Sequence, residues 1–87
     1  MDLKYFREQI DIIDNELLRL FVARMKLSNQ IANYKKEHHL PIYDQVREQE
    51  ILQLVAEKVD PDFEESAQRL YSLLFELSRN YQNKCCS

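Results

Sequence analysis

The chain has 87 residues and a net charge of −3, from 12 Lys and Arg against 15 Asp and Glu. This fits a single domain over 1–87 and argues against a general nucleic-acid binder, because neutralising phosphates needs surplus basic charge. Glycine is absent, which excludes glycine-rich phosphate loops, and no apolar run is long enough for a membrane span or a signal-peptide core. We therefore expect a cytoplasmic, all-α protein.

The first predicted helix, about 2–38, is unusually long. Its apolar residues recur at alternating steps of three and four, which is the spacing of a heptad seam. They are Leu3, Phe6, Ile10, Ile13, Leu17, Leu20, Leu27, Ile31 and Tyr34. Such a helix spans roughly 55 Å, whereas a compact chain of this length has a radius of gyration of about 12 Å. We expect an intertwined antiparallel homodimer of two long helices, although a partner of unrelated sequence would also serve physically.

Two prolines set the boundaries of the remaining helices. Pro41 precedes a second helix, about 45–58, for which Asp44 is the expected N-cap. Pro61 opens a third helix, about 61–83, with Asp60 as the expected cap. Each helix has one apolar stripe, formed by Ile51, Leu52, Val55 and Val59 in the second and by Phe63, Ala67, Leu70, Leu74, Leu77 and Tyr81 in the third.

Three charged residues stand on faces that should be apolar. Arg24 interrupts the seam, Lys35 lies about 20° from it around the helix, and Glu48 shares the stripe of the second helix. A buried charge is costly unless a partner or ligand meets it. Two of these charges also have a structural explanation, because Arg24 could set a coiled-coil register and Glu48 suits a helix N-terminus. Ser78 and Gln82, at the edge of the third stripe, are by themselves ordinary boundary residues.

Arg7 is too distant from Arg24 for one chain to place both in a small-ligand site. The two are separated by roughly 25 Å along the helix and about 100° around it. In an antiparallel dimer, however, the partner subunit's Arg7 could reach Arg24. The sequence therefore predicts an inward-facing basic cluster that fits a small dianion, since arginine pairs with carboxylates through two parallel hydrogen bonds.

An ordered set of residues runs through most of the chain. It consists of Arg7, Ile10-Asp11-Ile12-Ile13-Asp14, Leu17-Leu18, Arg24, Lys35, Pro41-Ile42-Tyr43-Asp44, Arg47-Glu48, Ser78 and Gln82. Together these residues resemble the all-helical class of chorismate mutases. The resemblance implies an intertwined three-helix dimer with two active sites, each of which borrows an arginine from the partner's long helix.

The resemblance also implies which residues bind the substrate carboxylates. Arg24 and the partner subunit's Arg7 would hold the two carboxylates. Ser78 would bind a carboxylate, and Arg47 would support this pocket from slightly further out.

At the reacting atoms, the resemblance implies that Lys35 and Gln82 donate to the ether oxygen of the breaking bond. Glu48, helped by the backbone at Asp44, would accept from the ring hydroxyl. Arg24, Lys35 and Gln82 are thus the expected catalytic residues.

The implied activity is the intramolecular [3,3] rearrangement of chorismate to prephenate in phenylalanine and tyrosine biosynthesis. It requires no cofactor and no metal. The sequence likewise suggests no metal site, because His38 and His39 lack further ligands at zinc spacing and Cys85 and Cys86 are adjacent near the end. Two alternatives remain open: an isochorismate pyruvate lyase on the same fold, and a non-catalytic helical dimerisation module.

Overall fold

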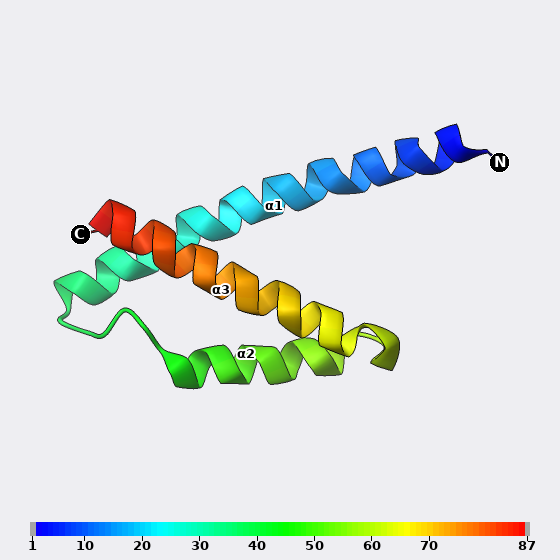
Figure 1. Ribbon diagram of the computed structural model, residues 1–87. Coiled ribbons are helices and arrows are strands. Elements are labelled where there is room, and N and C mark those ends of the chain that lie inside the picture. Colours follow the sequence, from blue (N-terminus) through cyan, green and yellow to red (C-terminus); the bar gives the residue numbers. More distant parts are fainter. Residues whose placement is uncertain (1, 87) are drawn as a thin grey trace.

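The computed structural model describes the backbone of residues 2–86 and the side chains of 2–84, and this part contains helices and no strand. Its elements are α1 (Leu3–Glu37), α2 (Gln45–Lys58), a short 3-10 helix η1 (Pro61–Phe63) and α3 (Glu64–Cys86). In Figure 1, α3 lies along α2 and crosses the C-terminal half of α1. The predicted all-α class is confirmed, and the first two helices end within one residue of the predicted bounds.

The third predicted helix differs from the structure at both ends. It opens with the 3-10 turn, where the Phe63 N–H donates to the Asp60 carbonyl at 2.8 Å, as is common where a helix begins. Asp60 takes the predicted N-cap position of this turn, but its carboxylate makes no capping hydrogen bond. At the other end α3 continues three residues past the predicted bound to Cys86, because residues 84–86 contain no Gly or Pro that would stop it. The side chains of Cys85 and Cys86 lie outside the described residues.

The N-cap of α2 is formed as predicted. Asp44 accepts a hydrogen bond from the Arg47 N–H at 3.0 Å, and Asp2 accepts from the Tyr5 N–H at 3.0 Å at the start of α1. Each carboxylate satisfies one of the backbone donors that a helix N-terminus leaves unpaired. The Asp44 cap fixes the first turn of α2, which carries Glu48, one of the predicted site residues.

The C-terminus of α1 turns sharply without a glycine. His39 takes the left-handed conformation with φ of 58°, which histidine adopts more readily than most residues. The Leu40 N–H donates to the Lys35 carbonyl at 2.8 Å, and the His39 N–H donates to the Lys36 carbonyl at 3.3 Å. This is the Schellman arrangement, and it directs the following loop back toward Lys35.

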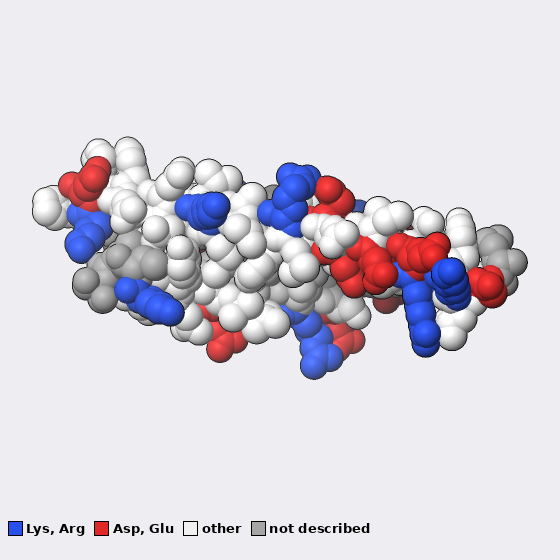
Figure 2. All heavy atoms as spheres, turned by 90° about the horizontal axis from the view of Figure 1, so that it is seen from above, with Lys and Arg blue, Asp and Glu red and all other residues white. Residues whose placement is uncertain are grey.

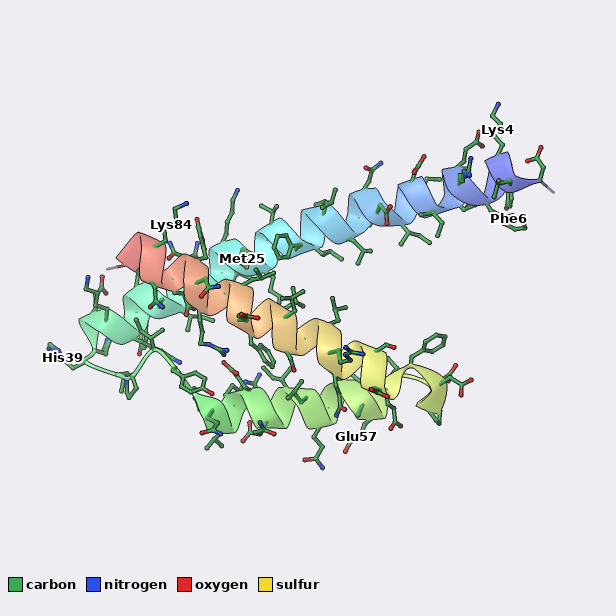
Figure 3. The ribbon with its side chains drawn as sticks, in the orientation of Figure 1. Lys4, Phe6, Met25, His39, Glu57 and Lys84 are labelled. Atoms are coloured by element: carbon green, nitrogen blue, oxygen red, sulfur yellow. The ribbon has the colours of Figure 1, made fainter. Side chains whose placement is uncertain are left out.

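The chain by itself has almost no core. Among the described residues only Ala32, Val55 and Phe75 are buried hydrophobics, and they lie where α3 meets α1 and α2. Every residue from 2 to 20 is exposed, and Phe6 projects from a part of α1 that no other helix accompanies (Figure 3). All nine seam residues are exposed, at 53–60% of their surface.

The dimensions of the molecule agree with this lack of a core. The radius of gyration is 16.1 Å and the longest extent is 55 Å, whereas a compact chain of this length would have a radius of about 12 Å. The accessible surface is 7258 Å², compared with about 5,400 Å² for a compact monomer of this mass. A large apolar surface is therefore left uncovered, as the predicted dimer requires.

Candidate active site

A cavity of about 130 Å³ lies where the three helices approach one another. Its lining comes from α1 (Arg24, Ser28, Lys35), the following loop (Ile42, Asp44), α2 (Arg47, Glu48, Ile51) and α3 (Phe75, Ser78, Arg79, Gln82). It thus brings together all the site residues predicted from the sequence except Arg7. Four of its lining side chains are cationic and two are anionic, so the cavity carries excess positive charge in an acidic protein.

A larger open groove, of about 1020 Å³, follows α2 and α3, and none of the predicted site residues lines it. Four glutamates and four glutamines line it, with Arg69 as its only cation. That charge balance does not favour a dianion, so the smaller cavity is the better candidate for the predicted site.

Arg24 is held in the cavity by uncharged groups. Its Nη1 donates to the Ser78 Oγ at 3.3 Å, and its guanidinium carbon lies 5.6 Å and 5.8 Å from the ring centres of Phe75 and Tyr71. These aromatic faces attract the cation without neutralising it. No ion pair joins Arg24 to a carboxylate within the described residues, so its charge remains available for an anionic ligand.

Lys35 is oriented by the loop that follows α1. Its Nζ donates to the Ile42 carbonyl at 3.3 Å. An ammonium group has three donors, so this bond leaves others that can contact a ligand. Like Arg24, Lys35 has no carboxylate partner in the part of the chain that the structure describes.

Gln82 and Ser78 are buried polar residues at the crossing of α1 and α3. The Gln82 Nε2 donates to the Ser28 carbonyl at 2.8 Å, and the Ser28 Oγ donates to the Ser78 Oγ at 3.4 Å. The Ser78 hydroxyl in turn donates to the Met25 sulfur at 3.5 Å, at the crossing seen in Figure 3. Sulfur is a weak acceptor, so this hydroxyl can turn toward a stronger one at small cost.

Glu48 faces the cavity from the first turn of α2 and forms an ion pair with Arg79 of α3. The guanidinium carbon of Arg79 also lies 4.8 Å from the ring centre of Tyr43, in the loop. The carboxylate of Glu48 is therefore linked to both α3 and the loop.

Asp44 and Arg47 lie at the exposed rim. The Asp44 carboxylate caps α2, and its carbonyl accepts from the Glu48 N–H at 3.1 Å. Arg47 pairs with Glu50 at 3.5 Å, and both of these side chains are more than half exposed. Arg7 is exposed near the free end of α1 and does not line the cavity.

Residues 6–83 match the family model described as chorismate mutase type II. This chain belongs to that family. A solved structure, chorismate mutase form II from Thermus thermophilus, matches with a TM-score of 0.88 and 28% identity over 93% of each chain.

Two curated relatives of this chorismate mutase domain are much longer proteins. The T-protein of Haemophilus influenzae is 46% identical over 59 residues, which are 64% of this chain and 16% of that protein. A bifunctional chorismate mutase/prephenate dehydratase of Aquifex aeolicus is 43% identical over 54 residues, 62% of this chain and 15% of that protein. The chain thus spans about a sixth of the length of the curated relatives it matches.

Sequence reasoning missed two polar residues of this site, Ser28 and Arg79. Each lies about one helical turn from a residue that the sequence did predict for the site. Ser28 is one turn after Arg24, and Arg79 lies three residues before Gln82 on the same stripe of α3. That spacing was the available signal, but only the packing shows that Arg79 meets Glu48.

Within the described residues, no group of three His, Cys, Asp or Glu side chains could hold a metal ion. None of the helices in this part of the chain combines the length and the apolar character needed to cross a membrane.

Proposed function

We propose that this chain catalyses the rearrangement of chorismate to prephenate, as an isomerase of phenylalanine and tyrosine biosynthesis. One observation carries the proposal: in a member of the chorismate mutase type II family, packing gathers Arg24, Lys35, Glu48 and Gln82 around a single cavity. The reaction breaks one bond and forms another within a single molecule. The protein's task is to hold a folded reactive conformer and to stabilise charge on the ether oxygen.

The substrate carboxylates are assigned to the cationic part of the cavity. Arg24 binds one carboxylate, because its charge is unpaired by any described carboxylate and its donors face the cavity. Ser78 joins it by turning its hydroxyl from Met25 to a carboxylate oxygen. Arg47, at the rim, adds positive charge further out.

The ether oxygen is assigned to Lys35 and Gln82. Each is already anchored through one N–H, to Ile42 and Ser28 respectively, and each keeps a further donor. Donors held in place before the reaction stabilise developing charge without reorganising. The ring hydroxyl is assigned to Glu48 and the backbone at Asp44.

The second carboxylate is assigned to the partner subunit's Arg7, in an antiparallel homodimer. The uncovered seam supports this assembly, and so does the charge along α1. Residues 2–20 contain five acidic and three basic side chains, whereas residues 21–37 contain four basic and one acidic. The acidic side chains visible from above gather toward the N-terminal end of α1 (Figure 2). Antiparallel pairing places these opposite charges against each other.

The deciding experiment is incubation of the purified protein with chorismate and, separately, with isochorismate. We expect the ultraviolet absorbance of chorismate to fall without release of pyruvate. Arg24→Ala should lose nearly all of this activity, and Arg69→Ala, which removes a cation of the outer groove, should keep it. Pyruvate from isochorismate would instead identify the lyase. If neither compound reacted, the remaining explanation would be a non-catalytic dimerisation module. The cytoplasmic location remains a prediction.

A further inference from the structure

The ion pair between Arg79 and Glu48 differs from the others in the described residues. It joins α3 to α2 across the cavity, with side chains that are 35% and 20% exposed. The two other ion pairs each join neighbouring turns of one helix at side chains that are 57–63% exposed. Exposed pairs of that kind contribute little, whereas a partly buried pair holds both partners in a defined geometry.

Arg79 is fixed by more than its charge. Its guanidinium carbon lies over the ring of Tyr43, 4.8 Å from the ring centre, while the guanidinium donates through Nη1 to the Glu48 Oε2. A planar guanidinium suits this combination of stacking and directed hydrogen bonding better than an ammonium group does. Arg79 therefore connects the loop, α2 and α3 at one point on the cavity wall.

The pairing leaves one half of the Glu48 carboxylate available. Oε2 is bound by Arg79, and Oε1 has no hydrogen-bond partner among the described residues. A carboxylate accepts through both oxygens, so Oε1 can accept from a substrate hydroxyl without breaking the pair. The neighbouring cation also offsets the repulsion that a lone carboxylate would exert on a dianionic substrate.

We propose that Arg79 is a positioning residue that orients and neutralises Glu48, so that the site selects substrates carrying the ring hydroxyl. The proposal rests on the proposed function, because it concerns the hydroxyl of the same substrate. Without Arg79, the Glu48 carboxylate is free to rotate and repels the dianion. The contact with the ring hydroxyl then no longer favours substrates that carry this group.

The test compares kcat/KM for chorismate and for an analogue with hydrogen in place of the ring hydroxyl, which still contains the rearranging bonds. We expect Arg79→Met to reduce the preference for chorismate at least about tenfold, since a site built to bind a hydroxyl discriminates strongly only while its acceptor is in place. In Arg79→Lys, the preference for chorismate should decrease less than in Arg79→Met. Arg69→Met, ten residues earlier on α3, should retain the wild-type preference.

An unchanged preference in Arg79→Met would overturn the proposal. It would do so whether kcat/KM falls equally for both substrates, which would mean a purely structural role, or falls for neither. Glu48→Ala removes the acceptor and should also lose the preference. Adding Arg79→Met to it should reduce the preference no further, because the effects of coupled residues are not additive.

A second measurement does not depend on activity. In denaturant unfolding at fixed protein concentration, the midpoint should decrease less in the double variant than the sum of the decreases in the two single variants. Strict additivity would contradict the pairing. A wild-type protein inactive on chorismate, by contrast, would contradict the proposed function while this measurement still tested the pair.

Discussion

At the scale of single residues, the bond from Gln82 to Ser28 determines the orientation of the amide. A backbone carbonyl can only accept, so the nitrogen of the Gln82 side chain faces Ser28, at 2.8 Å. The buried amide keeps its second N–H for another acceptor, which is the ether oxygen in the proposed reaction. A neutral amide provides both donors at any ordinary pH.

Replacement of Gln82 should therefore reduce turnover more than substrate binding. Gln82→Ala removes a donor to the transition state, which typically costs about 100-fold or more in kcat. Gln82→Glu should be slow at neutral pH, because an ionised carboxylate faces both the Ser28 carbonyl and the growing negative charge. Its turnover should rise as the pH falls and the introduced carboxyl protonates, but only in part, since a protonated carboxyl has one donor.

Gln68 provides the matched control for this pH profile. It also donates from Nε2 of an α3 side chain to a backbone carbonyl, that of Leu52 at 3.2 Å, but it lies in the outer groove. Turnover from about pH 5 to 8, corrected for unfolding, should follow the wild-type profile in Gln68→Glu. If Gln82→Glu followed the same profile, Gln82 would not contact the ether oxygen.

At the scale of elements, two aspartates that look alike in the sequence differ in the structure. Asp44 and Asp60 each precede a helix, and each was expected to cap it. Only Asp44 does so, because α2 begins as an α-helix with its third N–H directed at the carboxylate. The tighter turn at Pro61–Phe63 is instead closed by the Asp60 carbonyl. The local pattern identifies a helix start, but not the kind of turn with which it opens.

This difference predicts unequal effects of one substitution. Asp44→Ala should lower the free energy of unfolding by about 1 kcal/mol per chain, the usual effect of removing a side-chain cap. Asp60→Ala should change it by less than about 0.5 kcal/mol, as for other surface sites. Denaturant unfolding of both variants at one protein concentration measures the difference. Equal losses would contradict the assignment of the caps.

At the scale of the whole molecule, the uncovered seam predicts that folding and association are inseparable. The chain buries few hydrophobic side chains of its own, so the proposed partner subunit would supply the missing core. The thermal midpoint should then rise with protein concentration. An active, well-folded monomer at micromolar concentration in sedimentation would rule out the obligate dimer.

Two adjacent isoleucines test which face of α1 pairs. Ile13 belongs to the seam and Ile12 does not, yet they are similarly exposed, at 53% and 59%. Ile13→Glu should raise the dissociation constant of the dimer by at least about 100-fold. The predicted dimer would bury Ile13 of both subunits, and each of these side chains would contribute about 1.5–3 kcal/mol. Ile12→Glu should leave the dimer intact in sedimentation. The same effect from both substitutions would contradict the predicted seam.

The proposed shared active sites predict complementation between two inactive variants. Arg7→Ala and Arg24→Ala homodimers should each be nearly inactive. A heterodimer formed by mixing and re-annealing them has one site with both lesions and one site with neither, so it should approach half of the wild-type activity. Heterodimers that form but stay inactive would show that Arg7 does not act across the interface.

Features that depend on near neighbours along the chain could be predicted from the sequence. Proline positions and the spacing of apolar residues predicted α1 and α2 to within a residue, and the length of the seam indicated a chain that cannot bury its own apolar face. Helical spacing also placed Arg24 and Lys35 on one side of α1. These features are local because each helical hydrogen bond spans four residues.

Only the tertiary structure decided which of these faces meet. The bond from Gln82 to Ser28 and the bond from Arg24 to Ser78 each join residues 54 positions apart, and Arg79 meets Glu48 across 31. Such contacts depend on how α3 crosses α1 and lies along α2, and helical spacing carries no information about that crossing. Arg79 was unremarkable in the sequence for this reason: its partner is chosen by the packing of two helices, not by its neighbours in the chain.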